Sequence, residues 1–150
     1  MVDDLKKGYY LLFIDGGKRA SEQGQAEGAI GVIPQEPECG PVLATVAEKV
    51  GPVGSPQEAE YHALIRGLKL AAEKRLPYVA AFSDSANVVN QITGRWNKNE
   101  RATELYGQVE QALEPVKTWQ LSWVPREMNR DADKLVDRAF KGEPVTHATD

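Results

Sequence analysis

The amino-acid sequence predicts a single α/β domain built on a five-stranded mixed sheet, and three observations support this. The 150 residues, 41% hydrophobic and 27% charged, suit one domain with one core. Short runs rich in β-branched and aromatic residues indicate strands, and segments with apolar residues three and four apart indicate helices. Three strands come first, and helices then alternate with two more strands. This order favours an antiparallel meander of strands one to three, followed by two strands joined by helical crossovers.

The strand expected at the centre of the sheet is Tyr9–Asp15, six aromatic and aliphatic residues followed by an aspartate. Gly16 and Gly17 are predicted to turn the chain away directly after Asp15, and residues 16–27 to form a loop or the first part of a hairpin. The other predicted strands are 28–33, 42–50, 78–83 and 119–124.

Four helices are expected. Ser55-Pro56-Gln57-Glu58 has the form of a capping box, with a Ser cap, a Pro at the first helical position and a Glu three residues after the cap. It opens a helix that we expect to reach about Arg75. Apolar spacing predicts three more helices, at 86–93, at about 100–114, and around Ala132–Ala139. Residues 1–141 are expected to form the domain, and 142–150, which have no periodicity, a flexible tail.

The composition restricts the kinds of site and of cellular location that the chain can have. Cys39 is the sole cysteine, so an internal disulfide and a zinc knuckle are excluded. No run has the length of a membrane span or the form of a signal peptide, and we expect a cytoplasmic protein that is a monomer without an obligate protein partner. A net charge of −4 argues against binding to nucleic acid by bulk electrostatics alone. It leaves open a local site where carboxylates collect cations.

Acidic residues recur at the edges of the predicted elements. Asp15 and Asp84 each end an apolar strand, Glu60 lies near the start of a helix, and the last helix offers Asp131 and Asp133. Three of them have ordinary explanations: a turn residue for Asp15, a partner of the helix dipole for Glu60 and a helix cap for Asp84. If they meet, they need a counter-charge, because each carboxylate raises the pKa of the others. Oxygen-only ligands favour Mg²⁺ or Mn²⁺.

Four motifs, taken together, resemble the type 1 ribonuclease H family, most closely its compact reverse-transcriptase-like branch. They are Asp15-Gly-Gly, Glu58-Ala-Glu60-Tyr-His-Ala-Leu, Phe82-Ser-Asp84-Ser-Ala-Asn-Val-Val-Asn-Gln-Ile and Val124-Pro-Arg-Glu-Met-Asn129-Arg-Asp-Ala-Asp133. The resemblance runs from about Tyr9 to Ala139. It implies a ribonuclease H-like fold and an endonuclease that cuts the RNA strand of RNA–DNA hybrids with two Mg²⁺ or Mn²⁺ ions. The same resemblance makes Asp15, Glu60, Asp84 and Asp133 the catalytic metal ligands, with Asp15 bridging both ions. The Ala-Asp match selects Asp133 over Asp131.

The residues expected to contact substrate are Gly16, Gln57, Ser85, Asn129, Arg126, Trp96 and Lys98. Asn129 and Arg126 also have ordinary alternatives, a helix cap and a surface ion pair. The chain departs from the family where an Asn pair usually precedes the glutamate helix, because Pro56 and Gln57 stand there. The short segment 94–100 leaves no room for the basic protrusion of larger members. These departures keep two other functions open: cleavage of double-stranded RNA or a DNA junction, and a non-catalytic nucleic-acid-binding module.

Overall fold

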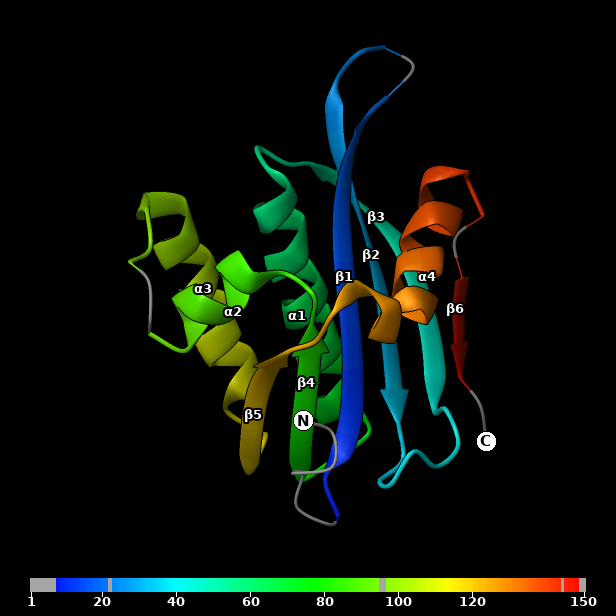
Figure 1. Cartoon of the computed structure of the whole chain (residues 1–150), viewed down its shortest axis with the longest axis vertical. Coiled ribbons are helices and arrows are strands. Elements are labelled where there is room, and N and C mark those ends of the chain that lie inside the picture. Colours follow the sequence, from blue (N-terminus) through cyan, green and yellow to red (C-terminus); the bar gives the residue numbers. More distant parts are fainter. Residues whose placement is uncertain (1–7, 22, 95–96, 144, 149–150) are drawn as a thin grey trace.

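The computed structural model describes residues 8–21, 23–94, 97–143 and 145–148, and it places them in one mixed sheet with helices on both faces (Figure 1). The strands are β1 (Tyr10–Ala20), β2 (Ala26–Gln35), β3 (Ala44–Pro52), β4 (Tyr78–Ser83), β5 (Thr118–Trp123) and β6 (Val145–Ala148). The helices are α1 (Pro56–Glu73), α2 (Ala86–Ile92), α3 (Glu100–Leu113) and α4 (Arg130–Phe140), with a 3₁₀ turn, η2 (Arg126–Met128), before α4.

The order of the strands across the sheet is β5-β4-β1-β2-β3-β6. Strands β1, β2 and β3 form the predicted antiparallel meander, while β4 pairs in parallel with β1 and β5 in parallel with β4. The predicted α/β class and the arrangement of the first five strands are therefore confirmed.

The prediction that β1 ends at Asp15 is wrong. The strand continues through Gly16 and Gly17 to Ala20 and pairs with β2 along this whole length, Asp15 opposite Gly31. The two glycines serve packing rather than a turn: a Cβ on Gly16 would overlap the backbone of helix α1, and one on Gly17 would lie 3.1 Å from the Val136 side chain of α4. Segment 16–27 is thus mostly hairpin strand.

The prediction of a flexible tail at 142–150 is also corrected. Residues Val145–Ala148 form β6, which pairs antiparallel with β3. Four residues are too few to show a period in the sequence. The pairing covers the outer edge of β3 and makes the sheet six-stranded.

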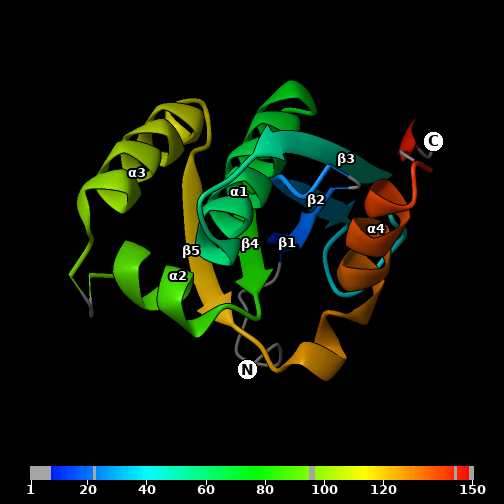
Figure 2. The same ribbon diagram turned by 90° about the horizontal axis from the view of Figure 1, so that it is seen from above.

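The helices form two layers. Helices α1, α2 and α3 cover one face, where Leu12, Ile14, Ile30 and Val32 meet Leu64, Leu68, Val88 and Leu105 in the main core. Helix α4 covers the other face and packs on Ala29, Ile33 and Ala47 (Figure 2). No helix within the described ranges has both the length and the apolar character needed to cross a membrane.

The pairing between strands β1 and β4 ends before either strand does. Their parallel pairing runs from Tyr10 opposite Val79 to Phe13 opposite Phe82, and β1 then continues for seven residues to Ala20. We call the opening between them, from Ile14 on one side and Ser83 on the other, the fork. It gives side chains from β1, β4 and the helices a place to meet.

Candidate active site

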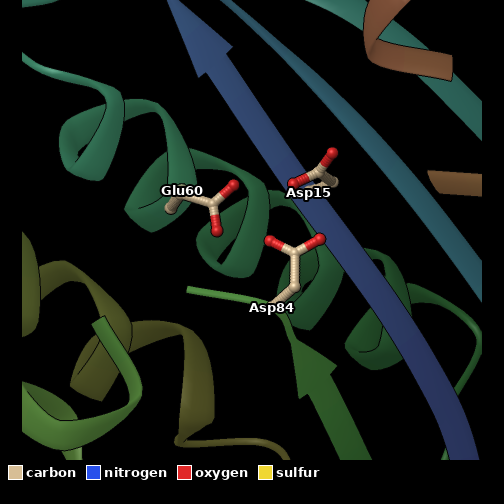
Figure 3. A group of neighbouring side chains, drawn as sticks. All are labelled: Asp15, Glu60 and Asp84. Carbon is tan, nitrogen blue, oxygen red and sulfur yellow. The ribbon is translucent and has the colours of Figure 1, made fainter. Parts of the chain in front are cut away.

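Three carboxylates meet at the fork. Asp15 comes from β1, Glu60 from α1 and Asp84 from the residue after β4, and one oxygen of each lies within 4.8 Å of the others. Figure 3 shows the three side chains pointing toward one another from their separate elements. Asp15 and Glu60 are buried, 6% and 5% exposed, although carboxylates rarely are. The arrangement therefore needs an explanation beyond turn, dipole or cap.

Glu60 is held from both sides of the fork. Ser55 caps α1 by accepting a hydrogen bond from the Glu58 backbone N–H at 3.2 Å, which fixes Glu60 in the first part of the helix. The Gly16 backbone N–H, freed from sheet pairing with β4, donates to Glu60 Oε1. The Ser83 hydroxyl donates to Glu60 Oε2 at 3.2 Å. Close approach of α1 to β1 at Gly16 is what makes the first of these bonds possible.

Asp84 is positioned by groups from β5 and from the start of α4. Asn129 Nδ2 donates to Asp84 Oδ2 at 3.3 Å and to the Ile14 carbonyl at 2.8 Å, and Trp123 Nε1 donates to the Asp84 carbonyl at 3.2 Å. The cap of α2 is Ser85, which accepts from the Val88 N–H at 3.3 Å. Asp84 is therefore not a helix cap, and Asn129 makes no capping bond in α4.

Asp133 stands at the open side of the same site. It lines a cavity of about 280 Å³ together with Asp15, Glu60 and Asp84, and it is exposed where Asp15 and Glu60 are buried. Asp131 lines a different cavity, between α4 and the meander. The structure thus separates two aspartates that the helical spacing alone left equivalent.

The protein environment raises the pKa of all three carboxyl groups in the cluster. Burial, and then the charge of Glu60, raise the pKa of Asp15. Burial also raises the pKa of Glu60, against the hydrogen bonds from Asp15, Gly16 and Ser83, which lower it. For Asp84, burial raises the pKa, while the Asn129 hydrogen bond and the nearby Arg126 charge lower it. Near neutral pH, the Asp15–Glu60 pair retains a proton unless a cation compensates its charge.

The donor set fits a hard divalent cation. The ligands are carboxylate oxygens from three elements, and no His or Cys joins the cluster among the residues that the structure describes. Such oxygen-only sites select Mg²⁺ or Mn²⁺ over zinc. The raised pKa values also indicate that the ionised cluster needs a positive charge nearby, because a bound cation would stabilise the ionised carboxylates.

Most of the residues expected to contact substrate surround this cluster. Gly16, Gln57, Ser85 and Arg126 line the cavity of the carboxylates. Asn129 contacts Asp84 from a buried position, 2% exposed, and its Oδ1 accepts no hydrogen bond from the residues that the structure describes.

Two of the expected contacts stand apart. Lys98 lies over the Tyr106 ring at 4.4 Å from its centroid and does not line the cavity. Trp96 lies outside the described residues.

Sequence reasoning did not single out Ser83. This side chain is fully buried, donates to Glu60 and accepts a hydrogen bond from the Ser85 N–H at 3.1 Å. The available signal was a polar residue closing an otherwise apolar strand directly before Asp84.

Comparison with known proteins agrees with the geometry. A family model described as reverse transcriptase-like matches residues 14–139. The bifunctional protein Rv2228c of Mycobacterium tuberculosis is 30% identical over 137 residues, which cover 91% of this chain and 36% of the relative. Ribonuclease HI of Halobacterium salinarum is 32% identical over 109 residues, 67% of this chain and 51% of the relative. The chain thus spans between a third and about half of the length of these curated relatives.

Solved structures give the same fold. The crystal structure of RNase H1 from Halobacterium salinarum matches with a TM-score of 0.79 at 27% identity, over 89% of this chain and 98% of that one. LC11-RNase H1, solved in complex with an RNA/DNA hybrid, matches with a TM-score of 0.78 at 26% identity, over 89% and 97%. These matches confirm the predicted ribonuclease H-like fold. The chain therefore belongs to the reverse-transcriptase-like branch of the type 1 ribonuclease H family.

Proposed function

We propose that this chain is a metal-dependent endonuclease that hydrolyses the RNA strand of an RNA–DNA hybrid. The observation that carries the proposal is the meeting of Asp15, Glu60 and Asp84, from three separate elements, within 4.8 Å. The structural similarity to LC11-RNase H1, which was solved with a hybrid, supports the substrate class. The products would be a 3′-hydroxyl and a 5′-phosphate.

Asp15, Glu60, Asp84 and Asp133 would hold two Mg²⁺ or Mn²⁺ ions. When bound, such a pair of ions activates a water and stabilises the leaving oxygen of an in-line phosphodiester displacement. The chain supplies orientation: Ser83 and the Gly16 N–H fix the Glu60 carboxylate, and Asn129 fixes Asp84.

Substrate contacts would come from the rest of the cavity. Gln57 and Ser85 present an amide and a hydroxyl beside the carboxylates, and Arg126 presents a cation suited to phosphate. Gly16 lets the backbone approach closely. Recognition of a hybrid through 2′-hydroxyl and backbone contacts predicts little sequence preference.

The experiment that tests this function is cleavage of an end-labelled RNA–DNA hybrid in Mg²⁺, in Mn²⁺ and in EDTA. We expect cleavage by the native chain in either metal, none in EDTA, and none by Asp84→Asn. A second pair of variants tests the fourth ligand: Asp133→Asn should lose most of the activity. Its matched control, Asp137→Asn, should retain it, because Asp137 lies one turn further along α4 and pairs with Arg19 and Lys141.

Matched substrates decide between this function and the alternatives. The same sequence is offered as hybrid, double-stranded RNA and a DNA junction. Faster cleavage of either of the last two would replace the hybrid as the substrate. If the native chain binds the hybrid but cleaves it in neither metal, the chain is a binding module and the enzyme hypothesis is wrong.

A further inference from the structure

A group of three basic side chains borders the site on the α4 side. Arg126 lies in η2, and Arg130 and Lys134 lie one helical turn apart on α4. With Glu127 and Asp133 they line a shallow surface cavity of about 550 Å³, and all three are exposed. We call Arg126, Arg130 and Lys134 the cation patch.

The side chains of the patch form no ion pair at contact distance among the residues that the structure describes. Elsewhere Arg19, Lys49, Arg66, Arg101 and Lys141 each pair with a carboxylate at 2.9 to 3.5 Å. Within the described part of the chain, no patch side chain forms such a pair, although Glu127 and Asp131 are neighbours in sequence. Three unpaired cations close together repel one another. They form a local positive surface on a chain whose net charge is −4.

The patch is continuous with the carboxylate site. Arg126 and Asp133 line both the cavity of the carboxylates and the cavity of the patch. The charge of Arg126 also lowers the pKa of Asp84, as expected for a guanidinium close to that carboxyl. A polyanion whose backbone enters the site between Asp84 and Asp133 would pass directly over η2 and the first turns of α4.

We propose that the cation patch binds consecutive phosphates of the strand that is cut, beside the scissile phosphate. The proposal rests on the proposed function and extends it, because it assigns contacts to Arg130 and Lys134 and a path along α4 to the substrate. Arg126 and Arg130 suit phosphate through bidentate hydrogen bonds, and Lys134 acts as a point charge. Arg130 and Lys134 lie one helical turn apart, about 6 Å between Cβ atoms. This spacing lets the two cations contact neighbouring phosphates of one nucleic-acid strand, because its phosphates repeat regularly. This local anchor offsets the unfavourable net charge of the chain.

The test is the salt dependence of hybrid binding, measured by fluorescence anisotropy in Mg²⁺. Asp84→Asn serves as the background so that the probe, a labelled RNA–DNA hybrid, stays intact. Each phosphate contact adds roughly 0.7 to 0.9 to the slope of log K against log salt concentration. Arg130→Ala/Lys134→Ala removes two such contacts and should therefore reduce the magnitude of the slope by about 1.4 to 1.8 and weaken binding at low salt.

Lys69→Ala is the matched control. It removes one exposed cation from α1, on the opposite face of the sheet, and should leave the slope unchanged. Circular dichroism and thermal melts establish that each variant is folded. A slope in the double variant equal to that of the control would overturn the proposal.

The two proposals fail separately. If the native chain cuts the hybrid but the double variant keeps its slope, the patch is not a phosphate site and the nuclease stands. If the magnitude of the slope falls by about 1.4 to 1.8 while the native chain never cuts, the patch is a nucleic-acid surface and the enzyme hypothesis fails.

Discussion

The strongest physical prediction concerns Asp15 in the metal-free chain. Its pKa is raised by burial and by Glu60, whose own pKa is raised to about 7. In the unfolded chain both carboxyls titrate near 4. Between about pH 5 and pH 7 the folded state therefore holds a proton on Asp15, and below pH 7 a second one on Glu60, that the unfolded state has lost. A raised carboxyl pKa contributes stability below the unfolded value, and this stability is lost as pH rises toward the folded value.

The magnitude follows from proton linkage. One extra proton in the folded state lowers the free energy of unfolding by about 1.4 kcal/mol for each pH unit, or about 2.7 kcal/mol from pH 5 to pH 7. Asp15→Asn removes the group that holds the Asp15 proton and should reduce the slope by about this amount, while Glu60 keeps its own contribution. The assay is urea unfolding in EDTA at pH 5, 6 and 7 for the native chain and the variant.

Asp137→Asn is the control for this experiment. The Lys141 and Arg19 hydrogen bonds lower the pKa of Asp137, so it is ionised throughout the pH range and its loss leaves the slope unchanged. His62, whose pKa is lowered by burial, contributes an opposite slope in every variant and cancels in the comparison. An undiminished slope in Asp15→Asn would refute the account of the buried pair.

Four further predictions follow from single features of the structure. Mg²⁺ should raise the melting temperature more at pH 8 than at pH 5, because binding must displace the retained proton; equal shifts would contradict this. Gly16→Ala should cost about 3 kcal/mol because its Cβ meets the backbone of α1, whereas Gly107→Ala, with open space around it, should gain up to about 1 kcal/mol in urea unfolding. Asn129→Ala leaves the buried Ile14 carbonyl without its donor and should cost about 1 to 3 kcal/mol, measured in the same way. Truncation after Gly142 removes β6 and bares the edge of β3, so sedimentation should detect self-association that the full chain lacks.

The types of helix and strand were predicted well because the spacing of apolar residues along the sequence matches the buried face of each element. The run Tyr78–Ser83 is the strand that was expected, and the capping box at Ser55 opens α1 as its spacing indicated. The interpretation of Gly16-Gly17 failed for a physical reason. Glycine marks either a turn or a close approach of two backbones, and only the position of α1 against β1 distinguishes them.

The site was predicted as a set of residue types rather than as a geometry. Strand ends placed Asp84 correctly, since the carboxyl ends of neighbouring strands share an edge of the sheet. Which aspartate of α4 faces the site, and the buried link from Ser83 to Glu60, depend on helix rotation and side-chain packing. The sequence carries only indirect signals for them: the family's Ala-Asp match for Asp133, and a polar residue closing an apolar strand for Ser83.

The fork also makes the carboxylate cluster depend on tertiary assembly. Its three buried or half-buried carboxylates are contributed by β1, by α1 and by the end of β4, segments far apart along the chain. No local stretch gathers two of them, so an unfolded or partly docked chain offers a cation only isolated acids. Cations would then bind almost exclusively to the native state, and their binding free energy would add directly to the free energy of unfolding. Under the proposed function, an incompletely folded chain would therefore lack the assembled carboxylate site that cleavage requires.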